Sequence, residues 1–343
     1  MQNGATGNFI RLVVIGAIVF TTARVAQSQT TKTPVKKPAS NRSAAFRTPW
    51  GDPDLQGVYS SDDFRGVPIE RPVALGEREF LTDEEYARRV QELGKQLQDD
   101  QAPTITNRKT GDLGQGNLQY WNDRGKPQRQ TSLVVDPPDG RIPYRDGKRP
   151  STEPGGGGSK RGTPINSPED LTLLERCIVG SLVQMPTGEP GAVRLLQAPG
   201  FVAITSEVIH ETRIIPLDGR PHAAPEIRLY LGDSRGHWDG ETLVVDTTNF
   251  NGKRQIQRSG PDMHLTERFA RTGPDTLRYE FTVDDPATYT RPWTARLELT
   301  PRSQLLEYAC HEGNYSVANM LSGSRADEKR AADKAKNAPS LEQ

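Results

Sequence analysis

The first 200 residues of this chain lack histidine altogether. The five histidines all follow that stretch: His210, His222, His237, His264 and His311. Imidazole is the side chain best suited to proton transfer near neutral pH, and it is also a common metal ligand. Its absence from the first part of the chain therefore confines histidine chemistry to roughly residues 200–320.

The chain also lacks net charge. Lysine and arginine together number 44, as do aspartate and glutamate, so the formal net charge is +0. Proteins that bind nucleic acid neutralise phosphates with an excess of basic side chains. The charge balance argues against nucleic acid as a partner, and we expect a small-molecule ligand or substrate instead.

Long apolar runs are scarce. One run, Leu12–Phe20, follows Arg11 and precedes the small-residue stretch Ala26–Ser28. A basic residue, a short apolar core and a small-residue cleavage site are typical of a secretory signal peptide. We predict a signal peptide over residues 1–28, with a retained N-terminal anchor as the alternative. The mature protein is then expected to be periplasmic or secreted, with no membrane span after cleavage.

The remaining chain divides by composition. Residues 29–47 are rich in Thr, Lys, Pro and Ser and predict a disordered leader. Residues 48–325 are predicted to form a single β-rich domain, in which residues 48–185 wrap around a β core at 190–315. Residues 326–343 predict a charged tail that is either a frayed helix or disordered.

Only two cysteines are present, Cys177 and Cys310. Disulfides persist in the oxidising compartments that exported proteins reach. A disulfide between the two is therefore our first hypothesis, and two separate buried thiols are the alternative.

Two helices are predicted. Thr82 and Glu85 form a capping box, and apolar residues at helical spacing continue to about Gln98. A second helix is expected over Glu169–Cys177, with Pro168 at its first position.

Short strand patterns dominate after residue 190, and Asp-Gly and Asn-Gly turns separate several of them. The predicted strands are Val193–Leu196, Phe201–Thr205, Val208–Ile215, Ile227–Leu231, Thr242–Val245, His264–Phe269, Leu277–Val283, Trp293–Leu299 and Leu306–His311. Short segments near Leu55 and Leu133 could complete the sheet. The pattern predicts a mainly β fold, an antiparallel barrel or sandwich with a few peripheral helices, and a lipocalin-like barrel is one form of it.

Several predicted strands carry a polar face, because alternate side chains of a strand share a face. These faces either converge inside a barrel as a pocket or lie on the solvated outside, and we favour the pocket. The residues expected to perform acid–base catalysis are His210, His311, Glu307, Glu280 and Glu312. The residues expected to contact the substrate are Arg213, Arg291, Trp238, His237 and Asn314.

The first functional hypothesis is an enzyme of the hydrolase or lyase type that acts on a small organic molecule. The alternatives are a non-catalytic binding module and an interaction protein without a pocket. A metal site formed by His210, His237 and His311 is a weaker hypothesis, because these histidines lack metal-binding spacing. We therefore predict neither metal nor cofactor. Gly232–Gly236 matches G-x-S-x-G, but it lies at a turn before a hairpin and does not predict a nucleophile.

The chain resembles a family of exported bacterial proteins of unestablished function. The segments that carry the resemblance include Asp54–Val58 (DLQGV), Ser132–Pro143 (SLVVDPPDGRIP), Gly232–Trp238 (GDSRGHW), Tyr279–Pro286 (YEFTVDDP) and Tyr308–Tyr315 (YACHEGNY). The resemblance implies export and one large domain, and it supplies no activity or catalytic residues.

Overall fold

The computed structural model describes residues 46–101, 125–148, 165–180, 182–185, 191–253, 255–312 and 314–336. The chain divides into two compact units, Met1–Arg42 and Ser43–Gln343, and all the described residues belong to the second. The predicted signal peptide, nearly all of the leader and the end of the charged tail lie outside the described residues.

Most regular structure in the described residues is β. The strands are β1 (Gly57–Ser60), β2 (Val134–Asp136), β3 (Ala192–Ala198), β4 (Phe201–Ser206), β5 (Thr212–Pro216), β6 (Asp233–Asp239), β7 (Thr242–Thr248), β8 (His264–Gly273), β9 (Thr276–Asp284) and β10 (Trp293–Pro301). The α-helices are α1 (Asp83–Gln101) and α2 (Ser316–Lys336). Short 3-10 helices cover Asp62–Phe64, Val73–Leu75, Pro168–Asp170 and Val208–His210.

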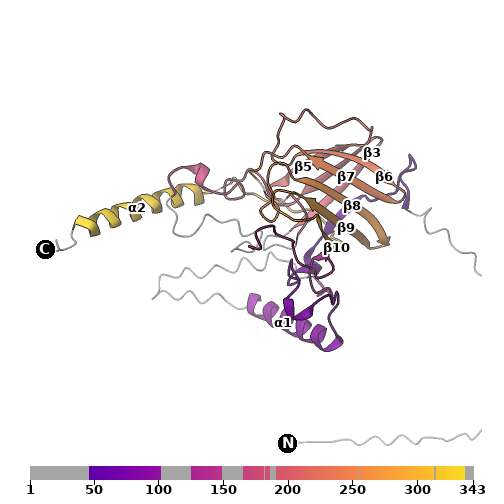
Figure 1. The fold of residues 1–343 in the computed structure, drawn as a ribbon, viewed down its shortest axis with the longest axis horizontal. Helices are drawn as coiled ribbons and strands as arrows, with labels where there is room; N and C mark the ends of the chain where they lie inside the picture. Colours follow the sequence, from indigo (N-terminus) through magenta and orange to yellow (C-terminus); the bar gives the residue numbers. More distant parts are fainter. Residues whose placement is uncertain are drawn as a thin grey trace, which may run out of the picture. The chain divides into compact units, whose positions relative to one another are not determined.

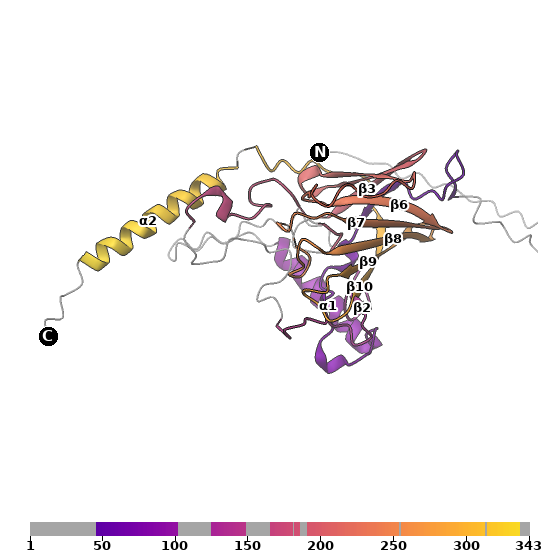
Figure 2. The ribbon, with the colours of Figure 1, turned by 45° about the horizontal axis from the view of Figure 1, so that its top comes forward.

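The strands form one antiparallel sheet in the order β5-β4-β3-β1-β10-β9-β8-β7-β6, with β2 also paired to β10. Figures 1 and 2 show β6 to β10 following one another across this sheet. The sheet curls until its end strands β5 and β6 lie against each other. The protein is therefore mainly β, an antiparallel sheet nearly closed into a barrel, as the strand and turn pattern predicted.

Alternation along the strands separates an apolar inner face from a polar outer face. In β9, Leu277, Tyr279, Phe281 and Val283 are buried, and the residues between them are half-buried. β10 repeats the pattern. The polar faces of these strands therefore point outward to solvent. They do not converge inside the barrel, which was the arrangement that we favoured from the sequence.

The seam between β5 and β6 is closed by side-chain packing. Gly236 of β6 lies directly beneath Leu217 and Ile215, so that a Cβ added there would meet Leu217 Cδ2 at 2.6 Å and Ile215 Cγ2 at 2.9 Å. Glycine at this position lets the two end strands approach.

The early segments complete the sheet as expected. β1 pairs with both β3 and β10, and β2 pairs with β10 at Thr294 and Ala295. α1 begins after Thr82, whose backbone N–H donates to Glu85 and whose hydroxyl accepts from the Glu85 N–H. The predicted capping box is confirmed.

Two predicted elements do not form. Leu306–His311 is not a strand, and it follows β10, whose edges are occupied by β9 on one side and by β1 and β2 on the other. Glu169–Cys177 is not a helix: only Pro168–Asp170 is helical, and Cys177 takes a left-handed φ of 54°. Tyr308 and Leu174, one from each of these segments, instead pack around the Cys177–Cys310 bridge.

Two other predicted strands are shorter than expected. The strand expected from Val208 begins only at Thr212, because Ile209 and His210 turn the chain with φ angles of 61° and 46°. Ile227–Leu231 reduces to one bridge between Leu229 and Phe250.

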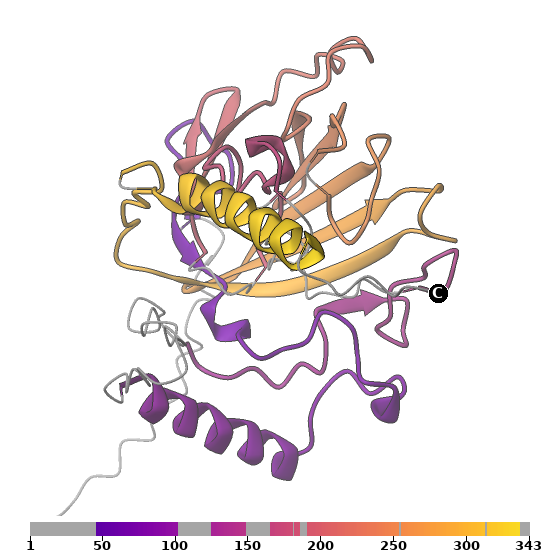
Figure 3. The same cartoon turned by 90° about the vertical axis from the view of Figure 1, so that its left-hand side faces the viewer.

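α2 continues the chain after this irregular segment. It contacts the 165–166 segment, because Ile165 N–H donates to Ser324 and Arg325 donates to the Ile165 carbonyl. Figure 3 shows the 3-10 turn that follows this segment beside the first part of α2. Among the described residues, no helix is both long enough and apolar enough to cross a bilayer.

Candidate functional site

A chain of hydrogen bonds joins two histidines and two aspartates on the outer face of β6, β7 and β8. In this His–Asp cluster (His222, Asp233, Asp246 and His264), Nδ1 of His222 is 3.0 Å from Asp233 and its Nε2 is 3.0 Å from Asp246. Nε2 of His264 lies 2.5 Å from the second oxygen of Asp246. Asp246 therefore links both imidazoles.

Strand register explains how these residues meet. Asp233 and Asp246 lie on the outward faces of β6 and β7, which pair as a hairpin through the turn at Gly240. His264 begins β8, which pairs with β7 on the other side. Neighbouring strands are about 4.8 Å apart, so short side chains on adjacent outward positions can touch.

His222 comes from the loop between β5 and β6 and is held there by several contacts. The backbone N–H of Ala223 donates to Asp233 at 2.9 Å. Asn249, with a left-handed φ of 58°, donates its side-chain amide to the carbonyls of Ala223, Ala224 and Ile227 at 3.1, 3.0 and 3.2 Å. The loop is therefore fastened over the cluster.

The cluster shifts the pKa values of its members. Burial alone would raise the pKa of Asp246, but hydrogen bonds from His264 and His222 outweigh burial and lower it. The pKa of Asp233 is lowered in the same way, against burial, by Ala223, His222 and Arg235. The hydrogen bond to Asp246 raises the pKa of His264, and Asp284 opposite it on β9 adds to the rise. Protonated His264 beside ionised Asp246 is thus favoured.

This geometry suits proton transfer. The His264 side chain is 44% exposed, and its Nδ1 has no hydrogen-bond partner among the described residues. A carboxylate on the other ring nitrogen fixes the orientation of the imidazole and stabilises its protonated form. Nδ1 is then the atom that could exchange a proton with a bound molecule.

A second charged group lies inside the barrel. Arg213 donates through Nη1 and Nη2 to Glu267 at 2.5 and 2.9 Å, and Tyr279 donates to the same carboxylate at 2.8 Å. Burial, followed by the charge of Glu267, raises the pKa of Tyr279 well above its ordinary value. Arg213, expected to hold an anionic substrate, is thus engaged by a buried carboxylate.

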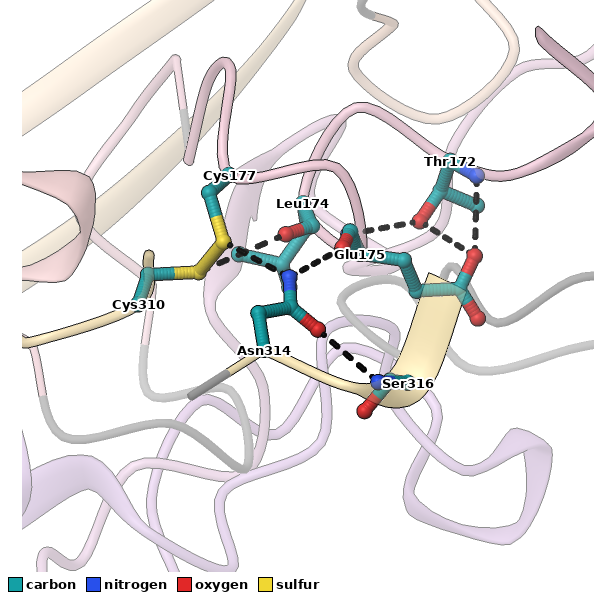
Figure 4. The surroundings of a disulfide bond; sticks show 7 residues. All are labelled: Thr172, Leu174, Glu175, Cys177, Cys310, Asn314 and Ser316. Atoms are coloured by element: carbon teal, nitrogen blue, oxygen red, sulfur yellow. Dashed lines mark hydrogen bonds between the residues drawn. A yellow bond between two sulfur atoms is a disulfide. The ribbon is translucent and has the colours of Figure 1, made fainter. Parts of the chain in front are cut away.

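The predicted disulfide between Cys177 and Cys310 is present, with Cα atoms 5.7 Å apart. Asn314, expected to contact substrate, donates its amide to the Glu175 carbonyl and approaches Sγ of Cys177, each at 3.2 Å (Figure 4). Asn314 therefore lies against the disulfide.

The residues predicted to perform acid–base catalysis are dispersed. His210 is exposed at the end of a 3-10 helix, and Glu307, His311 and Glu312 are exposed in the segment between β10 and α2. His210 and His311 both adjoin residues packed around the disulfide, but no hydrogen bond joins them in the part of the chain that the structure describes. Glu280 faces outward on β9, where Arg296 donates to it at 2.5 Å.

The other predicted substrate contacts also separate. Arg291 is exposed and donates to Asp136 at 2.9 and 2.7 Å. His237 lies on the exposed outer face of β6. Trp238, next to it, packs against the barrel core, and its buried Nε1 has no partner among the described residues.

The described residues contain no group of three or more His, Cys, Asp or Glu side chains arranged to hold a metal ion.

Sequence reasoning missed His222, Asp233, Asp246 and His264 as a site. The available signal was the hairpin: Asp233 and Arg235 alternate on one strand, and Asp246 lies at an outward position of the next. The loop that brings His222 back over the hairpin had no recognisable pattern.

Comparisons with known proteins add little. No protein-family model matches the chain, and no curated protein matches it. Among solved structures, the chain is similar to a crystal structure of a mutant of the fluorescent protein UnaG, with 14% identity over 38% of this chain and 86% of that chain. The TM-score is 0.22, so the fold assignment depends on strand order and register.

Proposed function

We propose that this protein is an exported enzyme of the hydrolase type that acts on a small molecule at the His–Asp cluster. The observation that carries the proposal is the 2.5 Å contact between His264 Nε2 and Asp246, with Nδ1 left without a described partner. The disulfide supports export, because such bonds persist in oxidising compartments.

In the proposed reaction, at a pH above the raised pKa of His264, Nδ1 of the neutral ring accepts a proton from water as the water oxygen attacks an ester carbonyl. Asp246 stabilises the imidazolium that forms, and His222 holds Asp246 in place. The imidazolium then returns the proton to the departing alkoxide. The carbonyl carbon gains a C–O bond to the water oxygen and loses its C–O bond to the alkoxide. The products are a carboxylic acid and an alcohol, and water is the only co-reactant.

Hydrolysis of 4-nitrophenyl acetate by the mature protein tests the proposal. His264→Gln and Asp246→Asn are expected to lower the rate on the order of 10²-fold, the usual contribution of a general base. His237→Gln is the matched control, because His237 is also outward on the same sheet but is exposed and outside the cluster. Melting curves establish that each variant folds.

Two results would contradict the proposal. One is an equal rate for wild type and His264→Gln, which would exclude His264 as the base, and a rate no higher than that without protein would favour a non-catalytic binding module. The other is loss of hydrolysis in His311→Gln or His210→Gln with His264→Gln unaffected, which would place the site beside the disulfide.

A further inference from the structure

The His–Asp cluster continues into a row of polar side chains that crosses the outer face of the sheet. Register places Asp246 of β7 opposite Thr266 of β8, Thr266 opposite Thr282 of β9, and Thr282 opposite Thr294 of β10. Thr294 in turn lies opposite Asp136 of β2. Figure 2 shows the five strands in this succession.

The row presents hydroxyls at regular spacing. Each of the three threonines is half-buried between two inward-facing residues, so its hydroxyl lies on the outer face. Neighbouring strands are about 4.8 Å apart, so the row from Asp246 to Asp136 spans roughly 19 Å. A threonine hydroxyl both donates and accepts, and a carboxylate at each end accepts.

Beside the threonines, a second outward row on β8, β9 and β10 consists of Arg268, Glu280 and Arg296. The charges of this row are neutralised by ion pairs. Arg268 donates to Asp239 at 2.8 Å, and Arg296 donates to Glu280 at 2.5 Å. Each of the two arginines is thus paired with a carboxylate. Threonine carries no charge, so the threonine row is charged only at its two ends. At one end, Asp136 is paired with Arg291, and at the other, Asp246 is paired with both histidines.

An uncharged row of hydroxyls, each of which can donate and accept a hydrogen bond, suits an uncharged ligand that also carries donors and acceptors. An anionic ligand would meet the Asp284 carboxylate, which lies opposite His264. An apolar ligand would leave unused the hydrogen-bonding capacity that Thr266 and the mutually bonded Thr282 and Thr294 hydroxyls still have. We infer that the row binds a neutral polyhydroxylated chain, of the saccharide class, and leads it to His264. This inference rests on the proposed function of the His–Asp cluster for its catalytic end, but the row can bind without catalysis.

The chain offers a matched pair of variants. Thr282 and Thr294 hydroxyls are 2.8 Å apart across β9 and β10. Thr205 and Thr212 hydroxyls are 3.0 Å apart across β4 and β5, on the outer face of strands that do not carry the row. Replacing either pair by valine removes two hydroxyls and keeps the β-branched shape.

The experiment measures binding of cellopentaose to the full mature protein by calorimetry, with NMR shifts to locate the contact. We expect the wild type to bind cellopentaose and not tetraethylene glycol, which has ether oxygens but few hydroxyls. The double variant Thr282→Val/Thr294→Val should bind roughly tenfold more weakly, as expected for two lost hydrogen bonds. The double variant Thr205→Val/Thr212→Val should bind as the wild type does.

Absence of cellopentaose binding to the wild type, or equal weakening in both double variants, would overturn the inference. Ester hydrolysis by wild type and His264→Gln, measured separately, tells this failure from failure of the proposed function. If hydrolysis depends on His264 while cellopentaose does not bind, only the saccharide inference fails. If cellopentaose binds through the row while His264→Gln hydrolyses normally, only the catalytic proposal fails.

Discussion

Arg213 and Glu267 form an ion pair inside the barrel, where Glu267 is 1% exposed. Removing one partner of such a pair leaves a buried charge uncompensated, which typically costs about 3–5 kcal/mol. We expect Arg213→Met to lower the free energy of unfolding by about that amount, as measured by urea denaturation. The triple variant Arg213→Met/Glu267→Leu/Tyr279→Phe removes the whole group and should lose less.

An exposed ion pair on the same barrel provides the control. Arg268 and Asp239 have side chains 41% and 62% exposed, and pairs of this kind contribute about 0–1 kcal/mol. Arg268→Met should therefore change the free energy of unfolding by less than about 1 kcal/mol. If Arg213→Met costs no more than Arg268→Met, the internal pair does not contribute to stability as its burial implies.

The His–Asp cluster should make stability depend on pH in two windows. The pKa of His264 is raised above its ordinary value of 6.5, so its contribution is fully present below that value and is lost as pH rises through the raised pKa. The pKa values of Asp246 and Asp233 are lowered from 3.8, so their contribution is present above that value and is lost as pH falls through the lowered values.

Urea denaturation of wild type and His264→Gln from about pH 6 to about pH 9 tests the histidine window. The stability advantage of the wild type should be largest at the acid end of this range and should shrink as pH rises. The opposite trend, or an advantage that His237→Gln reduces equally, would show that the hydrogen bond to Asp246 does not stabilise the protonated ring.

At the scale of elements, the local patterns that were confirmed include one hairpin and one helix start. The hairpin of β6 and β7 and the helix start at Thr82 follow from alternation, an Asp-Gly turn and a capping box. Leu306–His311 has the same alternation but joins no strand of the sheet. Which face of β9 points inward was also open, because both its faces carry residues that a barrel can accommodate.

The candidate site depended on contacts that no local pattern reports. His222 reaches the cluster through an irregular loop held by Asn249, and His264 reaches it through strand pairing. Loops of this kind leave no periodicity to detect. The sequence therefore indicated the part of the chain that holds the histidines, but it did not indicate that His222 and His264 lie together.

Closure of the barrel at the β5–β6 seam leads to a prediction for Gly236. A methyl group there would come within 2.6 Å of Leu217 and 2.9 Å of Ile215, closer than carbon atoms pack without displacement. Gly236→Ala should lower the free energy of unfolding by about 1–3 kcal/mol through overpacking. Gly273→Ala is the control, because its Cβ would find only ordinary contact at 3.6 Å. Equal effects would mean that the seam can open to accept the methyl group.

At the scale of the molecule, distant segments meet beside the 3-10 helix that ends at His210. Glu207, 3% exposed, accepts from Arg302 at 2.8 Å and from the N–H of Leu306 at 2.8 Å. Asn314 and the disulfide attach the same C-terminal segment to residues 175–177. The chain after β10 is therefore fixed to the barrel by polar contacts and one covalent bond, without a strand of its own.

Cys177 and Cys310 are separated by 133 residues, so their bridge closes a long loop. In the entropy model, a loop of this length constrains the unfolded chain by about 5 kcal/mol. Reduction should therefore lower the melting temperature of the mature protein by several degrees, measured by circular dichroism with and without a phosphine reductant. The double variant Cys177→Ser/Cys310→Ser should melt near the reduced wild type and should not respond to the reductant. Titration of denatured, unreduced protein should detect no free thiol, and detection of both thiols would refute the bridge.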